Sequence, residues 1–339
     1  MIRAALLACA LLACQSSSTS TPAPNTAPPV PNTAPLTEKG RVEHKRFASE
    51  ALGVEKDVVV YTPADYDSGK RYPVLYYLHG LGGSEDDWVE GGHIADVADA
   101  QRLQAIIIMP DGDNHFYADA STPTDYDACM RDGTGLFDPG APKAKTCVRT
   151  PNYERYITRD LIAWVDQNYR TIARREGRGI AGLSMGGFGA LQLSMRHVDL
   201  FAAAASHSGV DALLYAGPFP YEAGKVVLET NANNWGRTLG PFGAWIRGVF
   251  GTDIERWRSY DPAVLAGKLA PGPLALYLDC GTEDEFALHN GAQYLHDTLV
   301  ARGIEHAWYL GPGHHDFRFW SQRVPESLSF LSQKLAKPQ

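Results

Sequence analysis

The sequence predicts an α/β protein whose central sheet is mostly parallel and is covered by helices on both faces. Short, continuously apolar runs bounded by Gly, Pro or Asp recur along the chain, as expected for strands that are buried on both sides. Between them lie charged segments in which apolar residues return at every fourth position, which is typical of amphipathic helices. Strands that alternate with helices of this length favour parallel pairing.

Seven runs have the strand pattern, and three segments have the helix pattern. The strands are expected at 56–62, 73–78, 105–109, 179–183, 202–206, 274–280 and 307–310. The helices are expected at 157–169, 292–299 and 324–335. Gly303 follows the second of these helices, where glycine commonly ends a helix.

Two long stretches, 111–152 and 210–273, interrupt this alternation. Long irregular insertions in an otherwise tight α/β pattern are often functional loops or caps. The second stretch contains six aromatic residues that either line a site or form small local cores: Trp235, Phe242, Trp245, Phe250, Trp257 and Tyr260.

The composition is that of an ordinary globular protein. Of 339 residues, 44% are hydrophobic and 21% are charged, so the chain can bury a full core without metals or disulfides. The formal net charge of −8 and the absence of Lys or Arg clusters argue against a nucleic-acid partner. No apolar run reaches the roughly 18 residues that a membrane-spanning helix requires.

The N-terminus has the pattern of an export signal. Arg3 precedes an uninterrupted run of Ala, Leu and Cys at 4–13, and the run ends in Leu-Leu-Ala followed by Cys14, which resembles the lipobox of bacterial lipoproteins. We therefore expect a signal peptide at 1–13, lipidation of Cys14, and a location in the bacterial cell envelope. The alternative is ordinary cleavage near Ala13 and a freely secreted product.

A spacer is expected between this anchor and the folded part of the chain. Residues 15–37 carry no charge and are dominated by Ser, Thr, Pro and Ala, so they cannot bury enough apolar surface to fold. We expect an extended linker at 14–39 and one catalytic domain at 40–339. The anchor would be the only contact of the protein with a membrane.

The remaining cysteines predict one disulfide. Cys129 and Cys147 lie in the same Gly-, Asp- and Pro-rich stretch, and in an oxidising compartment they are expected to pair. Cys280 ends an apolar run and is expected to be a buried thiol rather than a nucleophile. No Cys/His spacing matches a zinc site, and we expect neither a metal nor a cofactor.

The strongest chemical signal is the Gly-Leu-Ser-Met-Gly motif at 182–186. It has the G-x-S-x-G form, in which the serine occupies a sharp turn between a strand and a helix and the flanking glycines let that turn close. An apolar strand precedes it, and small residues follow. Ser184 is therefore the candidate nucleophile.

A nucleophile of this kind requires an oxyanion hole. One donor would be the N–H of Met185, directly after the serine, and the other an N–H from a loop that follows an earlier strand. The segment 78–83, Leu-His-Gly-Leu-Gly-Gly, ends such a strand and predicts the N–H of Leu81 as the second donor.

The serine also needs a histidine base and an acid, in the chain order Ser, acid, His. Asp279 and Asp284 follow or end one strand, and His314 and His315 follow the next, at the sheet edge where ligand sites form. The residues alone leave open which Asp is the acid and which His is the base. The His-His-Asp cluster could also hold a metal, but no third set of ligands is spaced for it.

The chain resembles an esterase group of the α/β-hydrolase superfamily, which includes S-formylglutathione hydrolases, tributyrin and feruloyl esterases, and bacterial mycolyltransferases. The matching segments are 79–80 (His-Gly), 110–112 (Pro-Asp-Gly), 183–191, 199–201 (Asp-Leu-Phe), 208–209 (Ser-Gly), 280–284 (Cys-Gly-Thr-Glu-Asp), 312–317 and Trp320. Together they cover about 55–325, and the segment 119–150 has no counterpart in them.

The resemblance implies an α/β-hydrolase fold and the triad Ser184, Asp284 and His315. His314 stands where family members often have glycine. It also implies a serine carboxylic ester hydrolase that acts on a small-molecule or polymer-borne ester. The alternatives are an acyltransferase of the mycolyltransferase type, which moves the acyl group to a sugar hydroxyl, and a binding module without turnover, for which a damaged triad would be expected.

Overall fold

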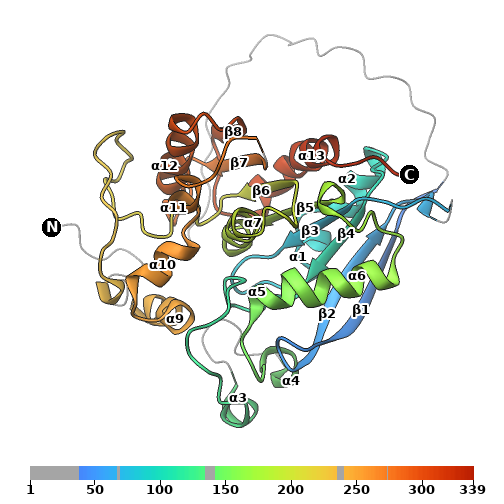
Figure 1. Ribbon diagram of the computed structural model, residues 1–339, viewed down its shortest axis with the longest axis horizontal. Coiled ribbons are helices and arrows are strands. Elements are labelled where there is room, and N and C mark those ends of the chain that lie inside the picture. Colours follow the sequence, from blue (N-terminus) through green and yellow to red (C-terminus); the bar gives the residue numbers. More distant parts are fainter. Residues whose placement is uncertain (1–37, 67–68, 134–141, 235–239, 273) are drawn as a thin grey trace, which may run out of the picture. The chain divides into compact units, whose positions relative to one another are not determined.

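The computed structural model describes residues 38–66, 69–133, 142–234, 240–272 and 274–339. Within it, Glu38–Gln339 is one compact unit, built around an eight-stranded sheet with the strand order β1-β2-β4-β3-β5-β6-β7-β8 (Figure 1). The strands are β1 (Arg41–Ser49), β2 (Val54–Thr62), β3 (Val74–Leu78), β4 (Ile106–Pro110), β5 (Arg178–Leu183), β6 (Ala203–His207), β7 (Ala275–Gly281) and β8 (His306–Gly311).

The mostly parallel sheet is confirmed. Strands β4, β3, β5, β6, β7 and β8 pair in parallel, and only β1 with β2 and β2 with β4 pair antiparallel. All seven expected strands are present, with ends within two residues of the predicted ones. The edge strand β1 was not predicted, because its sequence is largely charged and it buries only Phe47 and Ser49.

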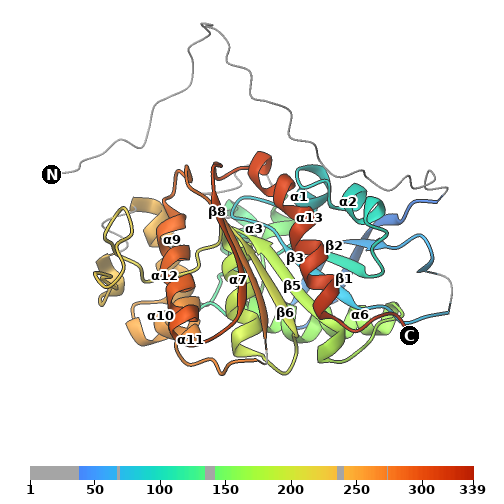
Figure 2. The ribbon, with the colours of Figure 1, turned by 90° about the horizontal axis from the view of Figure 1, so that it is seen from above.

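Successive strand residues point to opposite faces of the sheet and divide the core into two parts. On one face, Tyr77 and the strand residues that point to the same side pack against α1 (Asp87–Glu90), α2 (Ile94–Ala100) and α13 (Phe317–Lys334). Figure 2 shows α13 running along the strands. On the other face, Tyr76 and its equivalents pack against residues of α6 (Ile162–Asn168), α7 (Met185–Arg196) and α12 (Leu288–Ala301). Helices therefore cover both faces, as predicted.

The three expected helices are present with longer bounds. The first is built from α5 (Tyr153–Arg155), a π-helical turn (Tyr156–Leu161) and α6. The second, α12, ends two residues before Gly303, whose φ of 66° closes the helix. The third, α13, starts at Phe317, because the Asp316 side chain caps its first turn by accepting the N–H of Phe319. A 3₁₀ turn (Arg175–Gly177) precedes β5.

The second insertion is more regular than its sequence pattern indicated. It contains α9 (Gly240–Phe250), α10 (Ile254–Tyr260) and α11 (Pro262–Ala266), so the expectation of irregular structure was wrong there. These helices are short, and aromatic residues form much of their buried faces, which weakens the helical pattern. Phe250, Trp257 and Tyr260 join the main core rather than a local one. Trp235 and the Phe242 side chain lie outside the described residues.

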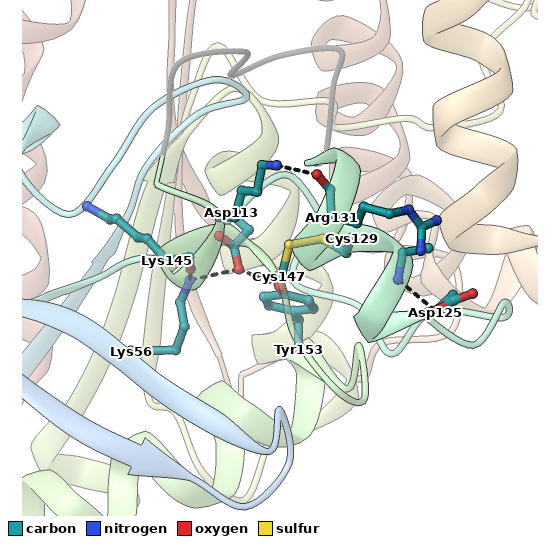
Figure 3. Close-up of a disulfide and its surroundings, with 10 residues drawn as sticks. Lys56, Asp113, Asp125, Cys129, Arg131, Lys145, Cys147 and Tyr153 are labelled. Atoms are coloured by element: carbon teal, nitrogen blue, oxygen red, sulfur yellow. Dashed lines mark hydrogen bonds and ion pairs between the residues drawn. A yellow bond between two sulfur atoms is a disulfide. The ribbon is translucent and has the colours of Figure 1, made fainter.

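The first insertion contains α3 (Tyr126–Asp132) and α4 (Lys143–Thr146), and the predicted disulfide joins Cys129 of α3 to Cys147, the residue directly after α4 (Figure 3). The two cysteines are 18 residues apart. Closing a loop of this size stabilises the fold by about 3 kcal/mol in the chain-entropy model. Cys280 is a buried free thiol, as expected.

The predictions for the N-terminus lie outside the described residues. They include the signal peptide at 1–13, the lipidation of Cys14 and nearly all of the linker at 14–39. In the part of the chain that the structure describes, no helix is both long and apolar enough to cross a membrane.

Candidate active site

Ser184 occupies the sharp turn that the motif predicts. It lies between β5 and α7 with φ 53° and ψ −116°, a backbone conformation that non-glycine residues rarely adopt. Its N–H donates to the carbonyl of His207 at the end of β6, at 2.9 Å. Such strain persists only where the surrounding structure holds it, and it is common at functional sites.

The flanking glycines are required by close packing. A Cβ at Gly182 would lie 2.3 Å from the backbone of Gly186, and one at Gly186 would lie 2.3 Å from the carbonyl oxygen of Leu78. Any side chain at either position would force the turn open. The turn therefore brings the start of α7 directly against the end of β3.

The two segments that carry the predicted oxyanion donors lie side by side at this junction. Met185 is the first residue of α7, so its N–H has no acceptor within the helix. On the β3 side, a Cβ at Gly80 would lie 3.5 Å from the Cβ of Ser184, which places the loop containing Leu81 beside the serine. This arrangement fits the predicted pair of donors, whose role stays a prediction.

Asp284 and His315 form a hydrogen-bonded pair. Asp284 Oδ2 lies 2.6 Å from His315 Nδ1, and the side chains are 0% and 8% exposed. The other oxygen of Asp284 accepts the N–H of Phe286 at 2.9 Å. A buried carboxylate held in this way keeps the proton of the imidazole on Nδ1 and leaves Nε2 free to accept one.

His315 is held between two aromatic rings. Phe286 and Trp320 each pack edge to face on the imidazole, with ring centroids 4.9 Å away. Its neighbour His314 points to solvent and is 57% exposed, with Nδ1 2.7 Å from a Glu285 carboxylate oxygen. The hydrogen bond to Glu285 raises the pKa of His314 above its usual value. This geometry favours His315 over His314 as the base.

Asp279 is engaged elsewhere. Its Oδ2 lies 2.8 Å from Nδ1 of His207, its partner on the neighbouring strand β6, and both side chains are fully buried. Nε2 of His207 in turn lies 2.9 Å from the hydroxyl of Ser327, inside α13. Because Asp279 contacts neither His314 nor His315, the geometry favours Asp284 as the acid.

The serine and the histidine are linked through β6. Ser208 follows His207, the residue whose carbonyl binds the Ser184 N–H, and its hydroxyl accepts the indole N–H of Trp320 at 3.1 Å. Trp320 also packs on His315. Among the described residues no hydrogen bond joins Ser184 Oγ to His315, and without a bound substrate this catalytic contact is often long. The roles of Ser184, Asp284 and His315 stay predictions.

Other groups near the pair have structural roles. Cys280 Sγ lies 3.8 Å from Asp284 Oδ2, and burial raises the pKa of this thiol well above its usual value, so it stays protonated. Within the described ranges, no group of three or more His, Cys, Asp or Glu side chains could hold a metal ion.

Glu285 is a further residue of this region, and no motif in the sequence points to it. One of its carboxylate oxygens accepts the backbone N–H of His315 at 3.0 Å, and the other contacts His314. The carboxylate therefore ties the loop after β7 to the loop that carries the histidines. The sequence gives no signal for this contact, because the two loops are joined only in the folded protein.

A cavity of about 320 Å³ lies between the two insertions. Its lining includes His115, Val148, the disulfide cysteine Cys129 and, from α9, Trp245. None of the three predicted triad residues is part of this lining.

Comparison with known proteins identifies the class. A family model described as "Putative esterase" matches residues 49–331, so the chain belongs to this esterase family. It is 31% identical over 290 residues to Esterase Rv1288 of Mycobacterium tuberculosis, covering 82% of this chain and 56% of that protein. The chain thus spans about half the length of this relative. It is 24% identical to the acetyl esterase of Caldicellulosiruptor saccharolyticus, covering 79% of this chain and 86% of that protein.

Solved structures confirm the fold. An S-formylglutathione hydrolase from Agrobacterium tumefaciens superimposes with a TM-score of 0.65 at 21% identity, covering 90% of this chain and 98% of that one. The eight-stranded sheet with helices on both faces is an α/β-hydrolase fold, as the resemblance implied.

Asp284→Asn is expected to lower kcat for ester hydrolysis by about 10⁴-fold, because an amide favours the wrong tautomer of the histidine, as it does in serine proteases. Asp279→Asn is the matched control, since Asp279 is also a buried aspartate bonded to a histidine. We expect it to lower the midpoint of thermal unfolding and to change kcat by less than about tenfold. A severe loss of kcat in Asp279→Asn beside a mild one in Asp284→Asn would assign the acid to Asp279.

Proposed function

We propose that this protein is an exported serine carboxylic ester hydrolase that acts through an acyl-enzyme intermediate. The observation that carries the proposal is the Asp284–His315 pair, which lies at the same end of the sheet as the strained turn of Ser184. Membership of the esterase family supports it. The substrate is a small-molecule or polymer-borne ester, and the proposed chemistry requires no cofactor.

In the acylation step, Ser184 Oγ forms a bond to the acyl carbon while its proton moves to Nε2 of His315. The carbonyl oxygen gains a negative charge, which the N–H groups of Leu81 and Met185 stabilise. The bond from the acyl carbon to the alcohol oxygen then breaks, and the alcohol leaves with the proton from His315. Asp284 holds the imidazole and stabilises its charged form.

Deacylation repeats these events with water. His315 takes a proton from a water molecule, whose oxygen attacks the acyl carbon, and the serine leaves with that proton. The carboxylic acid is released, and the free enzyme is restored. Replacing water by a sugar hydroxyl would give the acyltransferase reaction with the same residues.

A panel of p-nitrophenyl esters, from acetate to long acyl chains together with a feruloyl ester, tests the proposal on the domain that starts at residue 40. Hydrolysis of any member that is lost in Ser184→Ala supports it. Incubation with an ester donor and sugar acceptors separates the two reactions. Acyl-sugar products formed faster than free acid would identify an acyltransferase, and no turnover with either would favour a binding module.

We also propose that Cys14 anchors the protein to the bacterial envelope. Replacing it, as Cys14→Ser in a bacterial host, is expected to move the full chain from the membrane fraction to the soluble fraction or the medium. Each buried CH₂ of an acyl chain contributes about 0.8 kcal/mol to membrane binding, so losing the chains releases the protein. Immunoblots of the two fractions measure the shift. Equal partitioning of both forms would favour cleavage near Ala13 and secretion.

A further inference from the structure

The loop after β4 holds the loop that would supply an oxyanion donor. The side-chain oxygen of Asn114 accepts the backbone N–H of Gly82 at 2.6 Å, although the two residues are 32 positions apart. Gly82 directly follows Leu81, the proposed donor. Within its own loop, a backbone hydrogen bond runs from the Gly83 N–H to the Gly80 carbonyl, at 3.1 Å, and spans this position. The Asn114 amide therefore fixes this loop from outside.

A second contact holds the other side of Leu81. Nε2 of the buried His79 accepts the N–H of Gly112 at 2.8 Å, and its Nδ1 donates to the Gly80 carbonyl at 2.7 Å. The segment 111–114 is thus hydrogen-bonded to the chain before Leu81, at His79, and after Leu81, at Gly82. Two such contacts restrict how the intervening peptide can rotate, and the direction of the Leu81 N–H depends on that rotation.

The segment 111–114 is itself held by buried ion pairs. Lys56 is fully buried on β2, and its ammonium lies 2.9 Å from Asp111 and 2.7 Å from Asp113. Figure 3 shows Lys56 beside Asp113. These two carboxylates raise the pKa of Lys56 although burial alone would lower it, so the lysine stays charged. The hydroxyl of the buried Tyr153 also donates to Asp113. The loop after β4 is therefore a rigid support.

Asn114 also has a contact with the second insertion. The indole N–H of Trp245, on α9, donates to the backbone carbonyl of Asn114 at 2.8 Å. Asn114 is thus hydrogen-bonded through its backbone carbonyl to the second insertion and through its side-chain oxygen to Gly82. Gly82 has φ 77°, a backbone conformation that residues other than glycine rarely adopt, so the loop depends on this conformation as well as on the hydrogen bond from Asn114.

We propose that Asn114 is a positioning residue for the oxyanion hole, and that it orients the Leu81 N–H through its hydrogen bond to Gly82. The proposal rests on the proposed esterase function. An oxyanion donor acts only if it is aimed at the charge that develops in the transition state, and the loss of one donor lowers kcat by about 10²–10³-fold. Losing the residue that aims a donor should cost less than losing the donor itself.

Asn114→Ala and Asn114→Leu test this role with one p-nitrophenyl ester. Leu has nearly the shape of Asn and lacks its acceptor, so it keeps the packing if Ala disturbs it. We expect both to lower kcat by about 10- to 100-fold and to change KM by less than about threefold. Asn168→Ala is the matched control, because the Asn168 amide also bonds a backbone group, the Trp164 carbonyl, at an exposed site on α6. It should behave as the unmodified protein.

A transition-state mimic separates positioning from a general structural effect. A trifluoromethyl ketone adds to a catalytic serine and places a negative oxygen in the oxyanion hole. Its inhibition constant should rise in Asn114→Leu by the same factor by which kcat/KM falls. The affinity for the carboxylate product should stay within threefold. Trp245→Phe, which removes the indole donor to Asn114 and keeps an aromatic ring at this position, should shift kcat and the ketone affinity in the same direction by about two- to tenfold.

The outcomes distinguish this proposal from the proposed function. If Ser184→Ala abolishes hydrolysis while both Asn114 variants keep the kcat of the unmodified protein, only the positioning role is overturned. A loss of kcat in the Asn114 variants with unchanged affinity for the ketone would also overturn it. If Ser184→Ala retains activity, the serine esterase assignment itself fails.

Discussion

Ser184→Ala is expected to lower kcat for p-nitrophenyl ester hydrolysis by about 10⁶-fold, because without the hydroxyl no acyl-enzyme can form. The turn itself should survive the change. Alanine has the same Cβ as serine, and the backbone bond from residue 184 to the His207 carbonyl does not involve the hydroxyl.

The measurement compares kcat of the purified variant with that of the unmodified protein, and thermal unfolding curves serve as the folding control. Ser194→Ala is a matched control, since Ser194 is a buried serine ten residues further along, inside α7, where its hydroxyl donates to the Leu191 carbonyl. It should retain most of its activity. If Ser184→Ala keeps more than about a tenth of the activity while its unfolding curve is unchanged, the whole serine mechanism is excluded.

His315→Ala is expected to resemble Ser184→Ala, and the double variant should be no less active than either single one, since members of a triad act as a unit. His314→Ala should change kcat by less than about tenfold, because His314 is an exposed partner of Glu285 and such surface pairs contribute little. The two adjacent histidines therefore form their own matched pair of variants.

The three variants are compared on one ester at one pH above the usual histidine pKa. An inactive His314→Ala beside an active His315→Ala would reverse the assignment. It would mean that the loop rearranges when substrate binds, so that His314 replaces His315 beside Asp284.

The parallel core of the fold was predictable because its strands are buried on both faces. In a run such as 105–109 every side chain is apolar, and a parallel strand covered by helices on both faces is one of the few structures that bury all of them. β1 escaped prediction because an edge strand with one solvated side contains many charged residues, and its place depends on pairing with β2. The helices of the second insertion were missed because their aromatic residues become buried only by packing against distant parts of the chain, as Phe250 does against Phe116 and against Phe188 of α7.

The candidate site was predictable where local backbone geometry leaves a mark in the sequence. The glycines around Ser184 are such a mark, since a tight turn excludes side chains. The choice between Asp279 and Asp284 could not be derived from the residues alone, because both lie near the end of one strand and only the fold shows which histidine each one contacts. Asn114 and Glu285 were missed for a similar reason, because each acts by a bond between distant loops.

The bonds around His207 repeat the order of a hydrolytic triad. Ser327, His207 and Asp279 are joined at 2.9 and 2.8 Å in the sequence hydroxyl, imidazole, carboxylate, yet all three side chains are buried. A search for catalytic triads by interatomic distances alone would therefore also select Ser327, His207 and Asp279. A fluorophosphonate reagent, which needs solvent access to a serine and an oxyanion hole beside it, should label Ser184 and leave Ser327 untouched. Access, rather than the arrangement of three side chains, separates a catalyst from a structural bond network.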